Sequence, residues 1–105
     1  MKTRVELDDQ PFQFIRTLAP EPRKRLRRAL HELERGRGDV KALHGAFAGY
    51  WRLRSATYRV VFRYAIDGGQ RVAKCIFAES RSVVYDLFAQ QLQELAKLGS
   101  SGRES

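Results

Sequence analysis

Arginine side chains form the most chemically suggestive pattern in this sequence. Fifteen of the twenty basic residues are Arg, whose planar guanidinium can bind phosphate through two parallel hydrogen bonds. Arg52 and Arg54 lie two residues apart in one expected strand, and Arg59 and Arg63 lie four apart in the next, so each pair shares a strand face. No acidic residue occurs from Val40 to Ile66. Because an arginine face without acidic partners is costly to bury, we expect it to be solvated or to bind phosphate.

The charge of the whole chain points the same way. The formal net charge is +8, and residues 23–81 hold fifteen basic against five acidic residues, a net +10. A polyanionic partner is the simplest inference, although a charged soluble surface is the alternative and charge alone does not separate RNA, DNA and acidic protein. A second basic group, which includes Arg23, Lys24 and Arg27, lies in an expected helix. That group is either a solvated helix face or a set of phosphate contacts that are independent of base sequence.

Other reactive residue types are scarce. Cys75 is the only cysteine, so the sequence excludes an intrachain disulfide and zinc sites built from cysteine pairs, and its apolar surroundings predict a buried, inert thiol. Neither His31 nor His44 belongs to a cluster of His, Asp and Glu residues with metal-ligand spacing, and we expect neither a metal nor another cofactor. His44 precedes a glycine in an expected loop, where it is a minor candidate for acid or base chemistry.

The elements that position these residues follow from hydrophobic periodicity and from Pro and Gly. A strand is expected over Lys2–Leu7, followed by a helix that starts at Asp8 and Asp9 and ends before Pro20. A second helix runs from Pro20 to Gly36, and residues 36–49 are expected to form a loop. Three strands with short turns follow, and then a helix from Ser82 onward; the strands are 50–55, 58–66 and 70–78.

This order, β-α-α-β-β-β-α, predicts an α+β sandwich with a small antiparallel sheet and helices packed on one face. Residues 1–98 are expected to form one domain, and residues 99–105 a disordered tail. The chain contains no apolar run near the ~18 residues that a membrane span needs. It also lacks the features of a secretion signal, so a cytoplasmic location is expected.

Several motifs resemble the core signature of the RelE/ParE superfamily of bacterial toxins. Leu43-His44-Gly45 matches a loop of that family, and the segment 49–64, with Tyr58-Arg59-Val60 in its second strand, matches the strands that follow. Arg81-Ser82-Val83-Val84-Tyr85 resembles the family's Arg-x-x-x-Tyr at the start of the last helix. The resemblance covers roughly residues 2–97.

This resemblance implies one of two activities. Toxins on the RelE side are ribosome-dependent, metal-independent endoribonucleases, in which a 2′-hydroxyl of the mRNA attacks the adjacent phosphate. Toxins on the ParE side inhibit DNA gyrase and cut no RNA. Members of both groups are neutralised by an antitoxin, which the resemblance implies is an acidic protein that binds the sheet edge and the final helix. A toxin fold kept only as a binding module is a third reading.

The resemblance also implies roles for individual residues. Arg59 would stabilise the scissile phosphate, because a fixed guanidinium favours the extra charge of the phosphorane. Arg52 and Arg54 would position phosphate, since Arg is too basic to act as a general base. Tyr85 would donate a proton or stack on a base. The residues expected to contact RNA or its phosphates are Arg52, Arg54, Arg63, Arg23, Lys24 and Arg27.

One position departs from the RelE pattern. Glu79 stands where RelE carries a basic residue, and Arg81 follows two positions later. Glu79 is therefore either a general base, with Arg81 in the phosphate role, or the mark of an incomplete nuclease site. The catalytic candidates are Arg59, Arg81, Tyr85 and Glu79.

Overall fold

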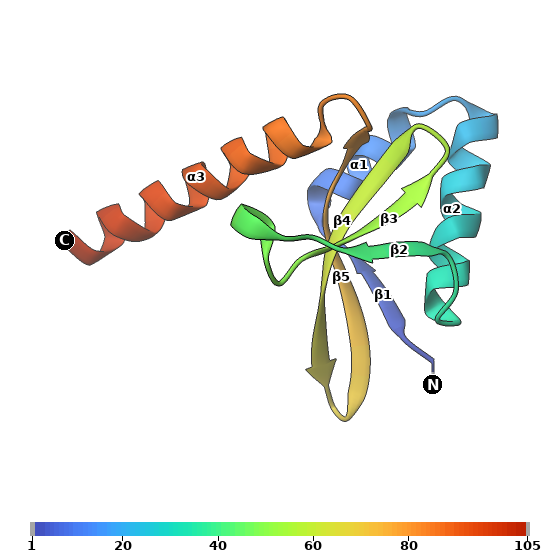
Figure 1. Ribbon diagram of the computed structural model, residues 1–105, viewed down its shortest axis with the longest axis horizontal. Coiled ribbons are helices and arrows are strands. Elements are labelled where there is room, and N and C mark those ends of the chain that lie inside the picture. Colours follow the sequence, from blue (N-terminus) through green and yellow to red (C-terminus); the bar gives the residue numbers. More distant parts are fainter. Residues whose placement is uncertain (1, 105) are drawn as a thin grey trace.

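Three helices and five strands make up the computed structural model, which describes the backbone of residues 2–104 and the side chains of residues 2–98 (Figure 1). The side chains of residues 99–105, where the sequence predicts a disordered tail, lie outside that range. The strands are β1 (Arg4–Leu7), β2 (Asp39–Ala42), β3 (Trp51–Ser55), β4 (Tyr58–Asp67) and β5 (Gln70–Ser80). The helices are α1 (Asp9–Thr17), α2 (Pro20–Glu34) and α3 (Val84–Glu104), with a short 3₁₀ turn at Gly45–Phe47.

The five strands form one sheet in the order β1-β5-β4-β3-β2. β1 pairs with β5 in parallel, and the other neighbours are antiparallel. The predicted α+β class with a mainly antiparallel sheet is confirmed. The prediction that residues 36–49 form only a loop is wrong, because Asp39–Ala42 pairs with β3 as an edge strand. These four residues alternate between exposed and half-buried positions, a pattern too short to stand out between glycines.

Helices α1 and α2 cover one face of the sheet, called here the covered face. Pro20 occupies the first turn of α2, where its missing N–H costs nothing, and the helix then buries Leu26, Leu30 and Leu33 at helical spacing. These leucines pack with Ile15 of α1 against strand residues of β3, β4 and β5; the buried strand residues are Leu53, Val60, Phe62, Ala73, Cys75 and Ala78.

Helix α3 packs against the opposite face of the sheet, called here the open face. The prediction that all helices pack on one face is therefore confirmed for α1 and α2 and wrong for α3. Val60 and Val61 are neighbours in β4 and both are fully buried, which requires cover on both sides of that strand. Val84 and Phe88 of α3 supply it by packing on Val61 and Phe77.

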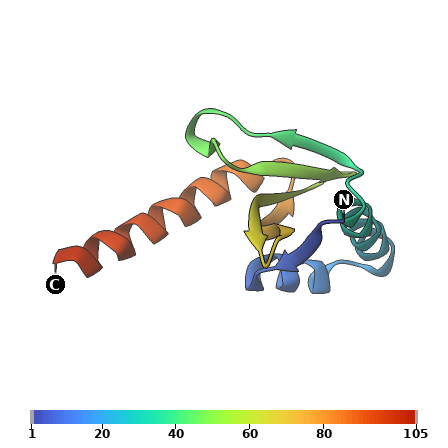
Figure 2. The ribbon, with the colours of Figure 1, turned by 90° about the horizontal axis from the view of Figure 1, so that it is seen from below.

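Beyond its first turns α3 extends away from the sheet (Figure 2). Its outer part exposes apolar side chains, since Leu95 is 57% exposed and Leu98 is 69% exposed. Among the described residues, none of the helices is both long and apolar enough to cross a membrane.

Candidate functional site

The open face carries a row of charged side chains across three strands. Arg54 of β3 lies opposite Arg59 of β4, and Arg59 lies opposite Glu79 of β5. Residues opposite one another in an antiparallel pair project to the same face, so these three side chains share one surface. Two like charges placed side by side repel each other, and the Arg54–Arg59 pair is therefore suited to bind an anion that bridges both guanidinium groups.

Arg59 is fixed in place by the turn between β3 and β4. Its Nη1 donates hydrogen bonds to the carbonyl oxygens of Ala56 at 3.0 Å and Tyr58 at 2.9 Å. The side chain is 8% exposed, which is low for a cation. The turn holds Ala56 in the left-handed region at a φ of 53°, so its carbonyl reaches Arg59 through a backbone conformation that non-glycine residues rarely adopt.

The electrostatic surroundings of Arg59 identify its neighbours. Burial lowers the pKa of its guanidinium most, and the positive charges of Arg54 and Arg52 lower that pKa further. Tyr85 acts in the opposite direction and raises the pKa of Arg59, while Arg81 lowers it. The group remains charged throughout the physiological range, because the ordinary pKa of Arg lies above 12. Arg52, Arg54, Arg81 and Tyr85 thus all lie close enough to Arg59 for their charges to act on it.

Asp39 of β2 partly neutralises this surface. Its Oδ1 accepts a hydrogen bond from Nη1 of Arg52 at 3.1 Å, and its Oδ2 lies 3.7 Å from Nε of Arg54. The hydrogen bond from Arg52 is the main cause that holds the pKa of Asp39 below its usual value. The carboxylate therefore occupies donors that a phosphate would use.

A groove of about 440 Å³ lies beside the arginine row. Its lining includes the cations Lys41 and Arg52, the aromatic rings of Phe47 and Tyr85, and His44. The rings of Phe47 and Tyr85 are 5.9 Å apart and tilted by 33°. Two cations next to two aromatic rings suit a nucleotide, because the rings contact a base and the cations contact its phosphate.

Arg81 and Glu79 sit on either side of Ser80 at the end of β5. The backbone N–H of Arg81 donates to the carbonyl oxygen of Thr57 at 2.6 Å, and its side chain is exposed beside a depression lined by Thr57, Ser80 and Ser82. Glu79 accepts a hydrogen bond at Oε1 from the backbone N–H of Ser80 at 3.0 Å. Within the described residues, no ion pair joins Glu79 to Arg59.

The other expected phosphate ligands lie elsewhere. Arg63 is exposed on β4 beside Lys74, four residues and about 13 Å along the strand from Arg59. Lys24 and Arg27 are exposed on α2, which packs on the covered face. Arg23 is used within the fold, since its Nη2 donates to the carbonyl oxygen of Leu18 at 2.8 Å beyond the end of α1.

Sequence reasoning missed three residues of this surface, namely Asp39, Lys41 and Phe47. The first two belong to the strand that was predicted as loop, and the polar–apolar alternation of residues 39–42 was the available signal. Phe47 reaches Tyr85 from a 3₁₀ turn, and nothing in its local sequence indicates that contact. Within the described residues, no group of three or more His, Cys, Asp and Glu side chains is arranged to hold a metal ion.

Solved structures of toxins share this architecture. One similar structure is the RelBE2 toxin–antitoxin complex from Mycobacterium tuberculosis. The match covers 77% of this chain and 100% of the matched chain, at 22% identity and a TM-score of 0.64. A YoeB/ParE toxin from Agrobacterium tumefaciens matches 74% of this chain and 98% of its own, at 20% identity and a TM-score of 0.59. The chain has the RelE/ParE toxin fold.

An archaeal example extends the RelE/ParE comparison. The RelE–RelB complex from Pyrococcus horikoshii matches 77% of this chain and 97% of its own chain, at 26% identity and a TM-score of 0.58. No protein-family model matches the sequence, and no curated protein matches it. The resemblance to RelE/ParE toxins expected from the sequence is thus confirmed through the fold.

Proposed function

We propose that this protein is the toxin of a type II toxin–antitoxin system and that it cleaves mRNA on the ribosome without a metal ion. The toxin role is supported by the solved toxins that share its fold. The nuclease activity rests on one observation: a buried guanidinium, that of Arg59, is fixed beside Arg54, Arg52 and Tyr85. A toxin of this kind acts in the cytoplasm, where ribosomes and mRNA are found.

The chemistry is an internal transfer at phosphorus. The 2′-hydroxyl loses its proton to a base, its oxygen forms a bond to the adjacent phosphorus, and the bond from phosphorus to the 5′-oxygen breaks. The products are a 2′,3′-cyclic phosphate and a 5′-hydroxyl. Arg59 and Arg54 stabilise the charge that develops on the phosphorane, a type of contribution worth about 100- to 1000-fold in rate when one donor is removed from comparable sites.

Four further side chains have parts in this step. Tyr85 gives a proton to the departing 5′-oxygen, and Glu79 takes the proton from the 2′-hydroxyl. Arg81 assists with phosphate binding from the end of β5. Arg52 orients the substrate from the groove that it shares with Tyr85.

A reconstituted translation assay with primer-extension mapping of the mRNA tests this function. We expect Arg59→Ala to slow cleavage about 100-fold or more, because no other donor replaces its contact to the phosphorane. Arg35→Gln is the matched control, since it removes an exposed positive charge at the end of α2 and lines neither the groove nor the depression beside Arg81. If Arg59→Ala and Tyr85→Phe both cleave like the wild type, the proposed site is wrong.

Gyrase inhibition is the second candidate function, and Glu79 is the observation that favours it. An acidic side chain stands opposite Arg59, where it lowers the positive charge next to the scissile phosphate. A DNA supercoiling assay decides between the two functions. Inhibition of gyrase without any RNA cleavage would establish the ParE-like activity, and a lack of toxicity without a partner would favour a binding module.

We further propose that an acidic antitoxin binds the outer part of α3 and a sheet edge. Two apolar side chains of this outer part are more than half exposed, Leu95 at 57% and Leu98 at 69%. A partner helix that packed against these side chains would bury their apolar surface away from water, which is favourable. Replacing Leu95 and Leu98 with Ser should therefore weaken neutralisation by the antitoxin while RNA cleavage continues.

A further inference from the structure

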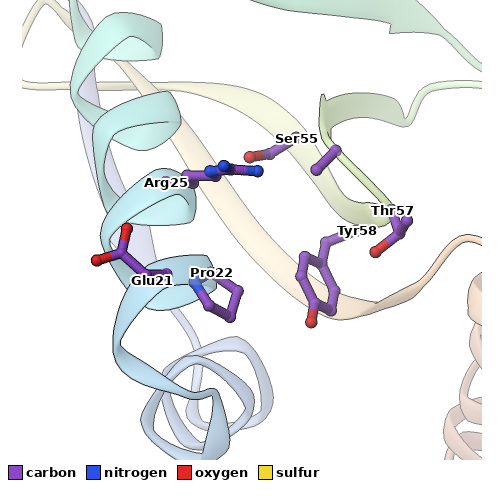
Figure 3. Close-up of a pocket in the computed structure, with 7 residues that line it drawn as sticks. Glu21, Pro22, Arg25, Ser55, Thr57 and Tyr58 are labelled. Atoms are coloured by element: carbon purple, nitrogen blue, oxygen red, sulfur yellow. The ribbon is translucent and has the colours of Figure 1, made fainter.

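A second cavity lies where α2 approaches the turn between β3 and β4. It encloses about 300 Å³, and Figure 3 shows the residues that line it. This turn pocket is formed by Glu21, Pro22 and Arg25 of α2 and by residues 55–58 of the turn. It belongs to the covered side of the sheet, so it is separate from the groove beside Tyr85.

Two side chains of the turn pocket, Arg25 and Tyr58, are placed to contact a ligand. Arg25 reaches from α2 toward Ser55, and the ring of Tyr58 lies across the cavity from Pro22 (Figure 3). Within residues 2–98, Arg25 forms no ion pair. The ring of Tyr58 is steadied by an edge contact with Phe14, at a centroid distance of 5.7 Å and an angle of 71°. A fixed ring beside an exposed guanidinium suits a base with its phosphate.

The turn pocket is connected to the proposed cleavage site through the turn itself. Arg59 is held by the carbonyl oxygens of Ala56 and Tyr58, and the backbone N–H of Arg81 is bonded to Thr57. Thr57 lines both the turn pocket and the depression beside Arg81. A chain that crosses the turn at Thr57 therefore passes from the depression beside Arg81 into the turn pocket.

We propose that the turn pocket binds a nucleotide of single-stranded RNA that flanks the cleaved bond, with Arg25 on its phosphate and Tyr58 against its base. The proposal rests on the RNA-cleaving function proposed above. The aromatic ring of Tyr58 favours RNA over an acidic peptide, because a peptide needs no stacking surface. Glu21 is the one acidic residue of the lining, and its carboxylate can accept hydrogen bonds from a base amino group or a ribose hydroxyl.

Binding of uncleavable RNA tests this assignment separately from cleavage. The probes are fluorescein-labelled 2′-O-methyl oligonucleotides of three and twelve nucleotides, measured by anisotropy over a range of salt concentrations. The twelve-nucleotide probe should bind wild type more tightly than the three-nucleotide probe, which is too short to occupy both places. Arg25→Gln should lower affinity for the longer probe about five- to tenfold and make its salt dependence shallower by about 0.7, the value of one phosphate contact to a single strand.

Two variants complete the experiment. Tyr58→Leu keeps apolar volume against Phe14 but removes the stacking surface, and it should lower affinity for the longer probe about fivefold or more. Arg35→Gln, which removes the same charge as Arg25→Gln at the opposite end of α2, should leave both affinities unchanged. Thermal unfolding of each variant verifies that it is folded.

The outcomes separate this proposal from the function itself. If Arg25→Gln and Arg35→Gln bind the longer probe equally, or if the longer probe gains nothing over the shorter one, the turn pocket does not bind RNA. A peptide occupant would give that result. If RNA cleavage is absent while binding of the longer probe depends on Arg25, the pocket assignment holds and the nuclease proposal fails.

Discussion

The two faces of the sheet contrast in how they are closed. The covered face is sealed by α1 and α2 over a continuous core that includes Leu26, Leu53 and Phe62. The open face is closed where Val84 and Phe88 of α3 and Phe47 of the 3₁₀ turn pack together, and another part of it carries the arginine row. The difference shows that the two faces of the sheet have different tasks: one holds the main hydrophobic core, while the other carries the charged side chains of the candidate site.

Arg59 marks the boundary between these tasks. Most of its surface is removed from water, and the carbonyl groups of Ala56 and Tyr58 offset the cost of that burial with two hydrogen bonds. The exposed Lys24 and Arg27 on α2 need no such support. Burial with preorganised partners, rather than charge itself, distinguishes the proposed catalytic arginine from the surface ones.

The largest expected effect is on stability and comes from the covered face. Leu26→Ala should lower the free energy of unfolding by about 2–5 kcal/mol, because it opens a cavity at a fully buried position. Leu95→Ala on the exposed part of α3 should change it by at most about 0.5 kcal/mol. Urea denaturation measures both. Equal losses in the two variants would contradict the assignment of the main core to the covered face.

Cys75 tests the covered face through pH. Burial raises the pKa of its thiol to about 12, so the unfolded chain loses the thiol proton first as the pH rises. Stability should therefore fall from about pH 9 toward pH 12, by about 1 kcal/mol for each pH unit. The measurement is the difference in unfolding free energy between wild type and Cys75→Ala at each pH. A difference that stays constant across this range would show that the thiol is not sealed from water.

Arg54 tests the open face. Arg54→Gln should lower affinity for a short single-stranded RNA about tenfold, since it removes a charged contact beside Arg59. The double variant Lys24→Gln/Arg27→Gln should weaken binding to ribosomes and keep affinity for the short RNA, because α2 lies on the other side of the sheet. Anisotropy and ribosome co-sedimentation provide the two readouts. Equal loss of short-RNA affinity in both variants would remove the distinction between the two basic surfaces.

The smallest expected effect is a gain. Asp39→Asn should raise affinity for the same RNA about two- to threefold, because the carboxylate no longer competes with phosphate for Arg52 and Arg54. The pKa of Asp39 is held below its usual value of 3.8, so its ion pair persists at neutral pH and is lost only as the pH falls through that lowered value. The gain should therefore be constant between pH 5 and 8. A loss of affinity would mean that Asp39 orients Arg52 for RNA instead.

The hydrophobic periodicity, together with Pro and Gly at the ends of helices and strands, was enough to predict most of the fold. The leucines of α2 and the alternation in the 50–55 strand follow directly from the geometry of a helix and a strand. The strand Asp39–Ala42 was missed because its alternation spans only four residues and its pairing with β3 forms only in the folded chain. The sequence also did not indicate which face of the sheet α3 covers. Val60 and Val61 are consecutive and both apolar, so their pattern does not distinguish one face from the other.

The candidate site was predictable in its residue types and less so in its partners. Arg52 and Arg54 must share a face because they are two residues apart, and the structure places Arg59 beside them. The ion pair from Asp39 and the contact of Phe47 with Tyr85 depend on segments brought together by folding. Neither contact leaves a local trace in the sequence.

The parallel pairing of β1 with β5 has a consequence for how the chain folds. Arg71 of β5 donates to Thr3, the residue just before β1, and these two positions are 68 residues apart. A contact that closes so long a loop forms late, because the intervening chain must lose conformational entropy before the contacts between the two strands can offset that loss. During synthesis, β1 therefore has no neighbouring strand until β5 has left the ribosome. The nascent chain therefore cannot complete its sheet until all five strands have emerged.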